Sequence, residues 1–345
     1  MIRINRKDLH LIAKEFNSYL EVWWKNKNTG NPKYDEWAST ANQDGQANLK
    51  AMLEYYKTVL PQLNRISDVD GLIKINVDFY RRFKTSILTW KKATSGKQKA
   101  KTEFGMFIKK MKYAYTSFFQ SDITVNGTVV NAGVWLSARL GIRVCPYCNR
   151  HYTFTIEENN NHPTVRPQFD HFLPKSAYPL TAVCFFNLIP ACAECNKTKG
   201  ENRIKIHPYE DSFDANSMKF RMKHPYKGKN DLIIQNGDRH PNIRKLALLD
   251  LYREHIDIVE ELAMKAMAYH HHYYDMLINS FSGLGISESD MERIVWGTSL
   301  ETAEMESKPF SKLTRDILEQ LGIKRGQCKR EQPDFPTASK AILIW

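Results

Sequence analysis

Four of the six cysteines fall into two Cys-x-x-Cys pairs, Cys145–Cys148 and Cys192–Cys195. A tight turn at this spacing points both thiolates at one metal ion, and two such turns supply four soft ligands in a tetrahedron, which suits zinc. A redox-active pair needs only one such motif, and ordinary buried cysteines have no reason to recur twice at ligand spacing. The spacing therefore predicts a Zn²⁺ site that is filled by protein ligands and is structural, not catalytic.

The 43 residues between the two pairs contain a second set of side chains that could do chemistry. Asp170 and His171 are adjacent, and Asn187 and Asn196 follow them. Near a strand end, a twist or bulge can bring an adjacent pair to one site. A carboxylate beside an imidazole suits a hard divalent ion and a base-activated water. Singly, the Asp-His pair could be surface or capping chemistry, Asn187 a turn residue and Asn196 a helix N-cap.

The complete pattern resembles the signature of the HNH, or ββα-metal, endonucleases between about Cys145 and Gly200. It reads Asp-His-x-x-Pro, then Asn, then Cys-x-x-Cys-Asn-x-x-Lys-Gly, with Asn196 at the third motif position in place of His. The resemblance implies that His171 is the general base and that Asp170 and Asn196 hold one catalytic Mg²⁺ or Mn²⁺ ion. It also implies that Asn187 orients the His171 loop, and that the reaction is hydrolysis of nucleic-acid phosphodiester bonds, above all in DNA.

Three segments, one at the start of this core and two beyond it, are similar to bacterial HNH proteins of anti-phage defence systems, as in the Septu type. They are Cys-Pro-Tyr-Cys-Asn-Arg at 145–150, His-Pro-Tyr at 207–209 and Ser-Lys-x-Thr-x-Asp-Ile at 311–317. The similarity implies a defence effector that acts beside a partner ATPase. His207 itself stays open between a metal ligand, a phosphate contact and a structural histidine.

The formal net charge of +12 favours a polyanionic partner, which is nucleic acid or an anionic membrane surface. No apolar run is long enough for a membrane-spanning helix, and the first residues lack the apolar core of a signal peptide, so we expect a cytoplasmic protein that does not bind membranes. Lysines in two places are predicted to contact nucleic acid without sequence preference, and a solvated helix face is the alternative. These lysines are Lys97, Lys99, Lys101, Lys175, Lys197 and Lys199.

The elements that must position these residues differ along the chain. Apolar residues recur at helical spacing in the first 120 residues, as in Leu9, Ile12, Phe16, Leu20 and Trp24. Another such stripe runs from Ile75 to Trp90, and the segment 91–101, rich in Lys, Ser and Gly, is expected to be an exposed loop. The segment from Ile123 to Val130 predicts a hairpin around Asn-Gly, the segment 144–207 mixes short strands with one short helix, and helices return after about residue 242. The chain is therefore predicted to be mainly α with a small α+β insert. Its parts are a basic helical region at 1–140, an HNH core with zinc knuckles at 141–210 and a helical C-terminal region at 211–345.

Three functions remain in competition. The first is the endonuclease. The second is a non-catalytic module, stapled by zinc, that binds nucleic acid or a partner protein; such a module has no need for Asp170, His171 and Asn196. The third is an HNH effector that is held inactive until a partner or self-association signals, which the large helical flanks suggest. Cys184 is expected to be a small core residue, Cys328 has no partner at ligand spacing, and the three consecutive histidines 270–272 cannot all face one metal.

Overall fold

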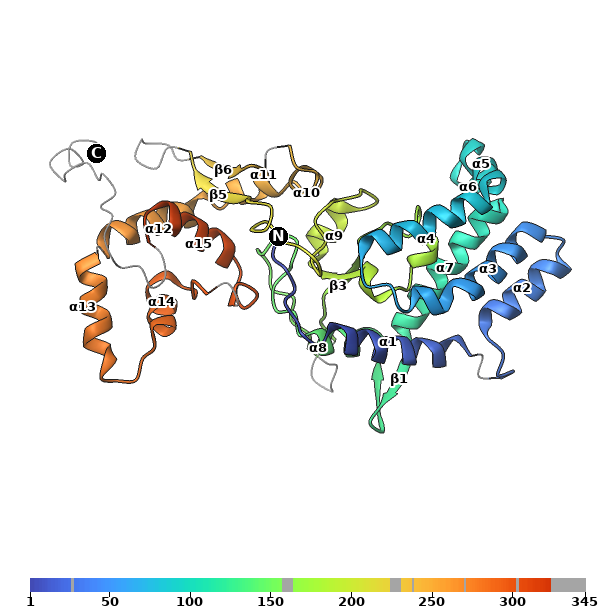
Figure 1. Cartoon of the computed structure of the whole chain (residues 1–345), viewed down its shortest axis with the longest axis horizontal. Helices are drawn as coiled ribbons and strands as arrows, with labels where there is room; N and C mark the ends of the chain where they lie inside the picture. Colours follow the sequence, from blue (N-terminus) through green and yellow to red (C-terminus); the bar gives the residue numbers. More distant parts are fainter. Residues whose placement is uncertain are drawn as a thin grey trace. The chain divides into compact units, whose positions relative to one another are not determined.

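The computed structural model describes residues 1–25, 28–156, 164–223, 231–237, 239–269, 271–301 and 304–323. Its contacts divide the chain into two compact units. The N-terminal unit comprises Arg3–Cys145 and Thr153–Glu210, and the C-terminal unit comprises Met1–Ile2, Pro146–Tyr152 and the residues from Asp211 on. Both are mainly helical, as predicted, and both contain small antiparallel sheets (Figure 1).

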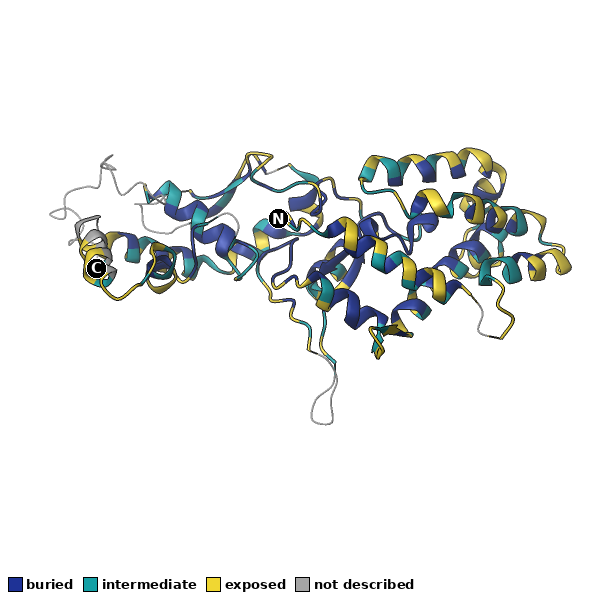
Figure 2. Ribbon diagram, turned by 60° about the horizontal axis from the view of Figure 1, so that its bottom comes forward, coloured by how far each residue is buried: buried dark blue, intermediate teal, exposed yellow. Residues whose placement is uncertain are grey.

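Helices dominate the first part of the N-terminal unit. The predicted stripe of Leu9, Ile12, Phe16, Leu20 and Trp24 is buried along the first helix. In Figure 2 such helices turn a buried face inward and an exposed face to solvent. The helices are α1 (Leu9–Trp24), α2 (Lys33–Gln43), α3 (Ala47–Leu63), α4 (Val69–Arg82), α5 (Lys84–Lys92), α6 (Gly96–Lys101) and α7 (Glu103–Gln120).

Two details of the helical prediction are wrong. The apolar stripe from Ile75 to Trp90 belongs to two helices, because the chain leaves helical geometry at Phe83, with φ −108° and ψ 30°. The lysine-rich segment 91–101 was expected to be an exposed loop, and it contains α6. A capping box starts this helix: the Ser95 hydroxyl accepts from the Gln98 backbone N–H, and the Gln98 side chain accepts from the Ser95 N–H.

The predicted hairpin is confirmed as β1 (Asp122–Val125) and β2 (Thr128–Asn131), which pair antiparallel. Asn126 and Gly127 both have positive φ, at 49° and 82°, as a two-residue turn of this kind requires. The Asn131 side chain then accepts from two backbone N–H groups and starts α8 (Ala132–Leu140).

The segment with the candidate site runs strand, strand, helix. Strand β3 (Gln168–His171) pairs antiparallel with β4 (Leu188–Ala191), and α9 (Ala193–Lys199) follows directly and packs against β3. Two short 3₁₀ turns, η1 (Pro179–Thr181) and η2 (Phe185–Asn187), lie between the strands. The sheet is buried: all four residues of β4 and the last three of β3 are shielded from solvent.

The C-terminal unit was expected to be helical, and it also contains a strand pair, β5 (Lys219–Met222) with β6 (Leu232–Gln235). The signal was the alternation of buried residues, with Phe220 and Met222 on one strand and Leu232 and Ile234 on the other. Its helices are α10 (Pro241–Lys245), α11 (Leu248–Arg253), α12 (Ile256–Ala268), α13 (His271–Ser282), α14 (Glu288–Trp296) and α15 (Ser311–Gln320). Within the described ranges, no helix is long and apolar enough to cross a membrane.

Candidate functional site

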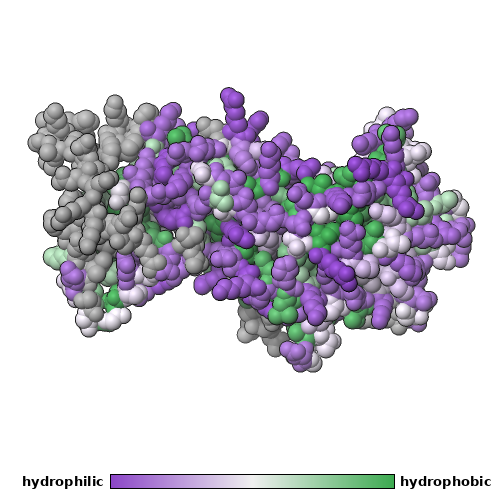
Figure 3. Space-filling view, in the orientation of Figure 1, coloured by the Kyte–Doolittle hydropathy of each residue, from purple (hydrophilic) through white to green (hydrophobic). Residues whose placement is uncertain are grey.

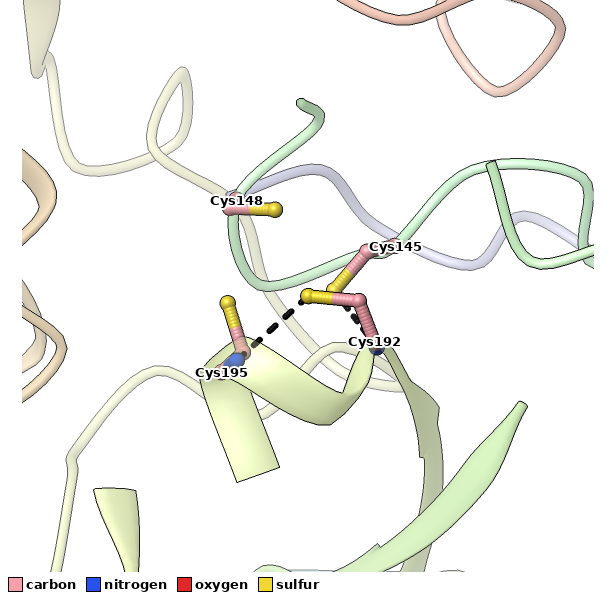
Figure 4. Close-up of side chains that lie close together, drawn as sticks. All are labelled: Cys145, Cys148, Cys192 and Cys195. Carbon is pink, nitrogen blue, oxygen red and sulfur yellow. Dashed lines mark hydrogen bonds between the residues drawn. The ribbon is translucent and has the colours of Figure 1, made fainter. Parts of the chain in front are cut away.

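The two Cys-x-x-Cys pairs come together as a cluster of four cysteines (Figure 4). All four sulfur atoms lie within 4.8 Å of one another. Zinc–sulfur bonds of about 2.3 Å in a tetrahedron place sulfurs about 3.8 Å apart, which is compatible with this limit. Cys145, Cys148 and Cys195 are buried and Cys192 is half-buried. The cluster can therefore hold a metal ion such as zinc, in agreement with the prediction.

Backbone N–H groups point at three of these sulfurs. The Cys192 N–H donates to Cys145 Sγ at 3.4 Å, the Cys195 N–H to Cys192 Sγ at 3.4 Å, and the Arg150 N–H to Cys148 Sγ at 3.3 Å. Such donors stabilise negative charge on sulfur and hold each thiolate in place before a metal binds. Cys192 is also the N-cap of α9, so the second pair is fixed by the start of that helix.

Asn149 joins two of the flanking motifs within the C-terminal unit. It follows the first cysteine pair directly, is fully buried and has a positive φ of 55°. Its Oδ1 accepts from the Lys312 backbone N–H at 2.9 Å and from the Ser311 hydroxyl at 3.2 Å. The Lys312 ammonium is itself buried and pairs with Asp316 and, at 2.9 Å, with Asp214. These motif residues therefore anchor α15 and the first cysteine turn.

His171 ends β3 and is buried. Its Nε2 lies 2.9 Å from the Ala182 carbonyl oxygen, which can only accept, so Nε2 carries the proton and Nδ1 has the lone pair. The Tyr115 ring packs edge-on against the imidazole at 4.4 Å between centroids. Burial, reinforced by the charge of Lys175, lowers the pKa of His171 to about 3. The imidazole is therefore neutral at pH 7, as a proton acceptor must be.

Asn187 holds the loop that follows His171. Its Oδ1 accepts from the Leu173 N–H at 2.7 Å, and its Nδ2 donates to the carbonyl oxygens of Leu173 at 3.1 Å and Thr181 at 3.0 Å. The side chain is fully buried. Asn187 thus ties the two ends of the segment between β3 and η2 together.

Asp170 forms an ion pair with Lys199, a residue that was predicted to contact nucleic acid. The buried Lys199 ammonium lies 3.2 Å from Asp170 Oδ1 and 3.0 Å from Oδ2, and it donates to the His171 carbonyl oxygen at 2.6 Å. Lys199 was expected to contact nucleic acid. It cannot do so from this position, because its side chain is fully buried, whereas Lys197 is exposed on the same helix. The signal was helical spacing, since Lys199 stands four residues after the buried Cys195.

Asn196 lies within α9, where Cys192 is the N-cap, so its alternative reading as a cap is wrong. Its Nδ2 donates to Gln168 Oε1 at 2.6 Å. Gln168 and Asp170 are two residues apart on β3 and so project from the same side of the strand. The helix therefore places Asn196 and Lys199 along the strand side that carries Asp170. Nothing in the motif pointed to Gln168.

The remaining lysines are placed as follows. Lys97 and Lys101 are exposed on α6 and Lys99 is half-buried there, 5.1 Å from the Trp90 ring centroid. Lys175 is half-buried over the Tyr115 ring at 4.4 Å, and burial lowers its pKa.

Cys184 is a buried core residue, as expected, and burial raises its pKa to about 12. Cys328, His162 and His270 lie outside the described residues.

His207 is a buried structural histidine. Its Nε2 lies 2.8 Å from the Phe186 carbonyl oxygen, its ring packs edge-on against Phe172 at 4.4 Å, and its Nδ1 has no hydrogen-bond partner among the described residues. Burial lowers its pKa to about 4. Of the alternatives left open by the sequence, these contacts favour the structural one.

An acid sensitivity is expected from His207. In the unfolded chain the His207 imidazole has an ordinary pKa of about 6.5 and is protonated below that pH, whereas in the folded chain it stays neutral down to about pH 4. The free energy of unfolding therefore falls as the pH decreases from about 6.5 to 4. Replacing His207 with glutamine, which can still donate to Phe186, should remove about 1.4 kcal/mol per pH unit from this slope. Urea unfolding at several pH values from 4.5 to 7 measures the difference. Parallel curves for the two proteins would contradict it.

A protein described as Septu protein PtuB, from Bacillus thuringiensis, is 36% identical to this chain over 64 residues. The match covers 19% of this chain and 22% of that protein, so the chain spans about a fifth of the length of the relative it matches. No family model and no solved structure matches the chain. The partial similarity agrees with the resemblance carried by the flanking segments.

Proposed function

We propose that this chain is a metal-dependent HNH endonuclease that hydrolyses phosphodiester bonds in DNA and acts as an effector of anti-phage defence. The observation that carries the proposal is the neutral, buried His171 at the end of β3, fixed at Nε2 and followed by a loop that Asn187 clamps. The strand–strand–helix order around it and the partial similarity to a Septu protein support the same proposal.

In this mechanism His171 takes the proton of the attacking water at Nδ1, because Nε2 already carries a proton that it donates to Ala182. Asn187 keeps the imidazole in place through the backbone of Leu173. Lys175 and Lys197 supply positive charge for the phosphates of the nucleic acid. The four-cysteine cluster holds a structural zinc, since all four ligand positions come from the protein.

A catalytic divalent ion fits the donor chemistry at Asp170 and Asn196, which offer a carboxylate and an amide oxygen. The Lys199 ammonium within 3.2 Å of both Asp170 oxygens supports a cation at this position. Asp170 and Asn196 would hold Mg²⁺ or Mn²⁺ there, and the ion would neutralise charge on the scissile phosphate. Its entry requires the Lys199 ammonium to share the carboxylate or move aside.

The test is cleavage by purified protein of plasmid DNA, single-stranded DNA and RNA, each with Mg²⁺ or Mn²⁺ and without added divalent metal. The proposal expects cutting of DNA only when divalent metal is added. A brief EDTA treatment should stop cleavage, and excess Mg²⁺ should restore it if the structural zinc, which exchanges slowly, has stayed bound. This control separates loss of the catalytic ion from loss of the zinc. No cutting of any nucleic acid under all metal conditions would overturn the proposal.

The second candidate is a non-catalytic module that binds nucleic acid or a partner protein. The Asp170–Lys199 ion pair favours it, because a buried carboxylate that is already neutralised needs no metal. This candidate expects nucleic-acid or partner binding that is unchanged by Mg²⁺ and is not followed by strand breaks.

A partner ATPase or self-association is part of the defence proposal. Large apolar side chains are exposed on α12, α14 and the segment that follows α13, as a docking face requires. They are Met264, Met267, Leu284 and Ile294, which are between 57% and 72% exposed. Light scattering and co-purification from the native host test this point. A monomer that co-purifies with nothing and cuts DNA at full rate would contradict it.

A further inference from the structure

The N-terminal unit contains a pocket of about 760 Å³ that the proposed reaction does not use. This volume lies in the range of about 300–1,000 Å³ that is typical of small-ligand sites. Helices α4 to α7, the segment 176–178 and Glu201 form its walls. Figure 3 shows apolar surface next to hydrophilic side chains over this unit.

The pocket combines two kinds of side chain. Four lysines face it, against one acidic residue, Glu201, and none of the four forms an ion pair with a described residue. The second kind of side chain is aromatic, and four aromatic rings line the pocket. The lysines are Lys84, Lys91, Lys99 and Lys112, and the rings are those of Tyr80, Trp90, Phe104 and Tyr178.

The rings are held in place by one another. Trp90 packs edge-on against Phe104 at 5.4 Å, and Tyr80 meets Phe104 edge-on at 6.2 Å. Phe104 is buried, whereas Trp90 and Tyr80 are half-buried and so keep ring surface for a ligand. The Lys99 ammonium lies over the Trp90 ring, 5.1 Å from its centroid, which places a positive charge beside an aromatic platform. Flat rings with lysines around them suit a ligand that is itself flat and anionic.

From this combination we infer that the pocket binds an unpaired nucleotide of a nucleic-acid strand, with the base stacked on Trp90 or a tyrosine and the phosphates on the lysines. A paired base has both faces covered by its neighbours in the duplex, so only a single-stranded or splayed base can stack on a protein ring. The inference rests on the proposed function and names its substrate class.

Two contacts connect the pocket with His171. Residues 176–178 line the pocket, and Ala182, a few residues on in the same segment, accepts from His171. Lys175, directly before this wall, lies over the Tyr115 ring, and that ring packs edge-on against the His171 imidazole. A strand anchored in the pocket would therefore run toward the proposed general base.

The test measures binding of a fluorescent 20-nucleotide single strand and of a blunt duplex of the same length, without added divalent metal, by the full chain carrying His171→Gln. Trp90→Ala should weaken single-strand binding about 5- to 150-fold, the value of one stacked base, and change duplex binding less than about twofold. Because Trp90 packs on Phe104, the double variant Lys84→Gln/Lys112→Gln provides a second pocket variant that leaves the rings intact.

The matched control is Lys97→Gln/Lys101→Gln, which removes the same charge from exposed positions that do not line the pocket. It should weaken single-strand and duplex binding by the same factor, through lost phosphate contacts alone. Equal losses for both nucleic acids in both pocket variants would overturn the inference. If the protein never cuts nucleic acid but the pocket variants lose single-strand binding selectively, the proposed function fails and the pocket stands. If the protein cuts DNA and the pocket variants bind both nucleic acids normally, the proposed function stands and the pocket inference fails.

Discussion

Replacing Cys195 with serine is expected to lower the zinc content of the purified protein from one equivalent to near zero and to unfold the segment between the two cysteine pairs. Four sulfurs within 4.8 Å of one another bind the metal together, so losing one ligand weakens the whole site. Structural zinc contributes about 10–16 kcal/mol in small zinc modules, which is comparable to the net stability of a domain, about 5–15 kcal/mol. Elemental analysis and limited proteolysis measure the two effects.

Cys184→Ser is the matched control for this change. Cys184 is buried in the same unit as Cys195, but it is not part of the cluster. This variant should retain one zinc. Zinc well below one equivalent in the unaltered protein, or full zinc in the Cys195→Ser protein, would show that the cluster is not a zinc site.

His171→Gln is expected to reduce the rate of DNA cleavage by about 10²–10⁴-fold, which is the usual contribution of a general base. Glutamine can still donate an N–H to the Ala182 carbonyl oxygen, but its amide has no basic nitrogen to take the place of Nδ1. The fold and the zinc content should therefore be unchanged. Cleavage rates at saturating Mg²⁺, together with thermal unfolding and zinc analysis, separate loss of chemistry from loss of structure.

The control is His207→Gln, because His207 is also buried and also bonds through Nε2 to a backbone carbonyl, that of Phe186. The two variants make the same chemical change in similar surroundings, and only one of them removes the proposed base. His207→Gln should cut DNA at close to the normal rate at pH 7. A loss of only twofold in His171→Gln, or equal losses in both variants, would refute the role of His171.

The sequence predicted the elements whose signals are local. Helical spacing identified the buried stripe of α1, and Asn126-Gly127 identified the hairpin, because both features depend on residues close together in the chain. The two Cys-x-x-Cys motifs likewise predicted a cluster, since each turn already sets the separation of its own two sulfurs. Assigning a role to Asn187 depended on the family resemblance, because its hydrogen bonds to the Leu173 backbone cannot be read from nearby residues.

The features that sequence reasoning missed depend on contacts between distant residues. Nothing near Asp170 indicates that its partner is Lys199, and nothing near His171 indicates that Tyr115 of α7 covers its ring. A lysine in a basic protein is expected at the surface, because burying its charge costs energy unless a carboxylate is buried with it. The packing of α9 against β3 supplies that carboxylate, which is Asp170.

If the divalent ion proposed at Asp170 binds, the Lys199–Asp170 pair makes its uptake an exchange of one cation for another. The ammonium is attached to the same chain, so it competes at a fixed local concentration that dilution does not reduce. Binding of an ion at Asp170 must therefore offset the loss of the Lys199 contact. The apparent affinity of the site for the ion is lower than the carboxylate alone would give. In return, the carboxylate is never left buried and unpaired, a state that costs about 3–5 kcal/mol. The strand and helix can thus remain folded in a cell where free divalent metal rises and falls.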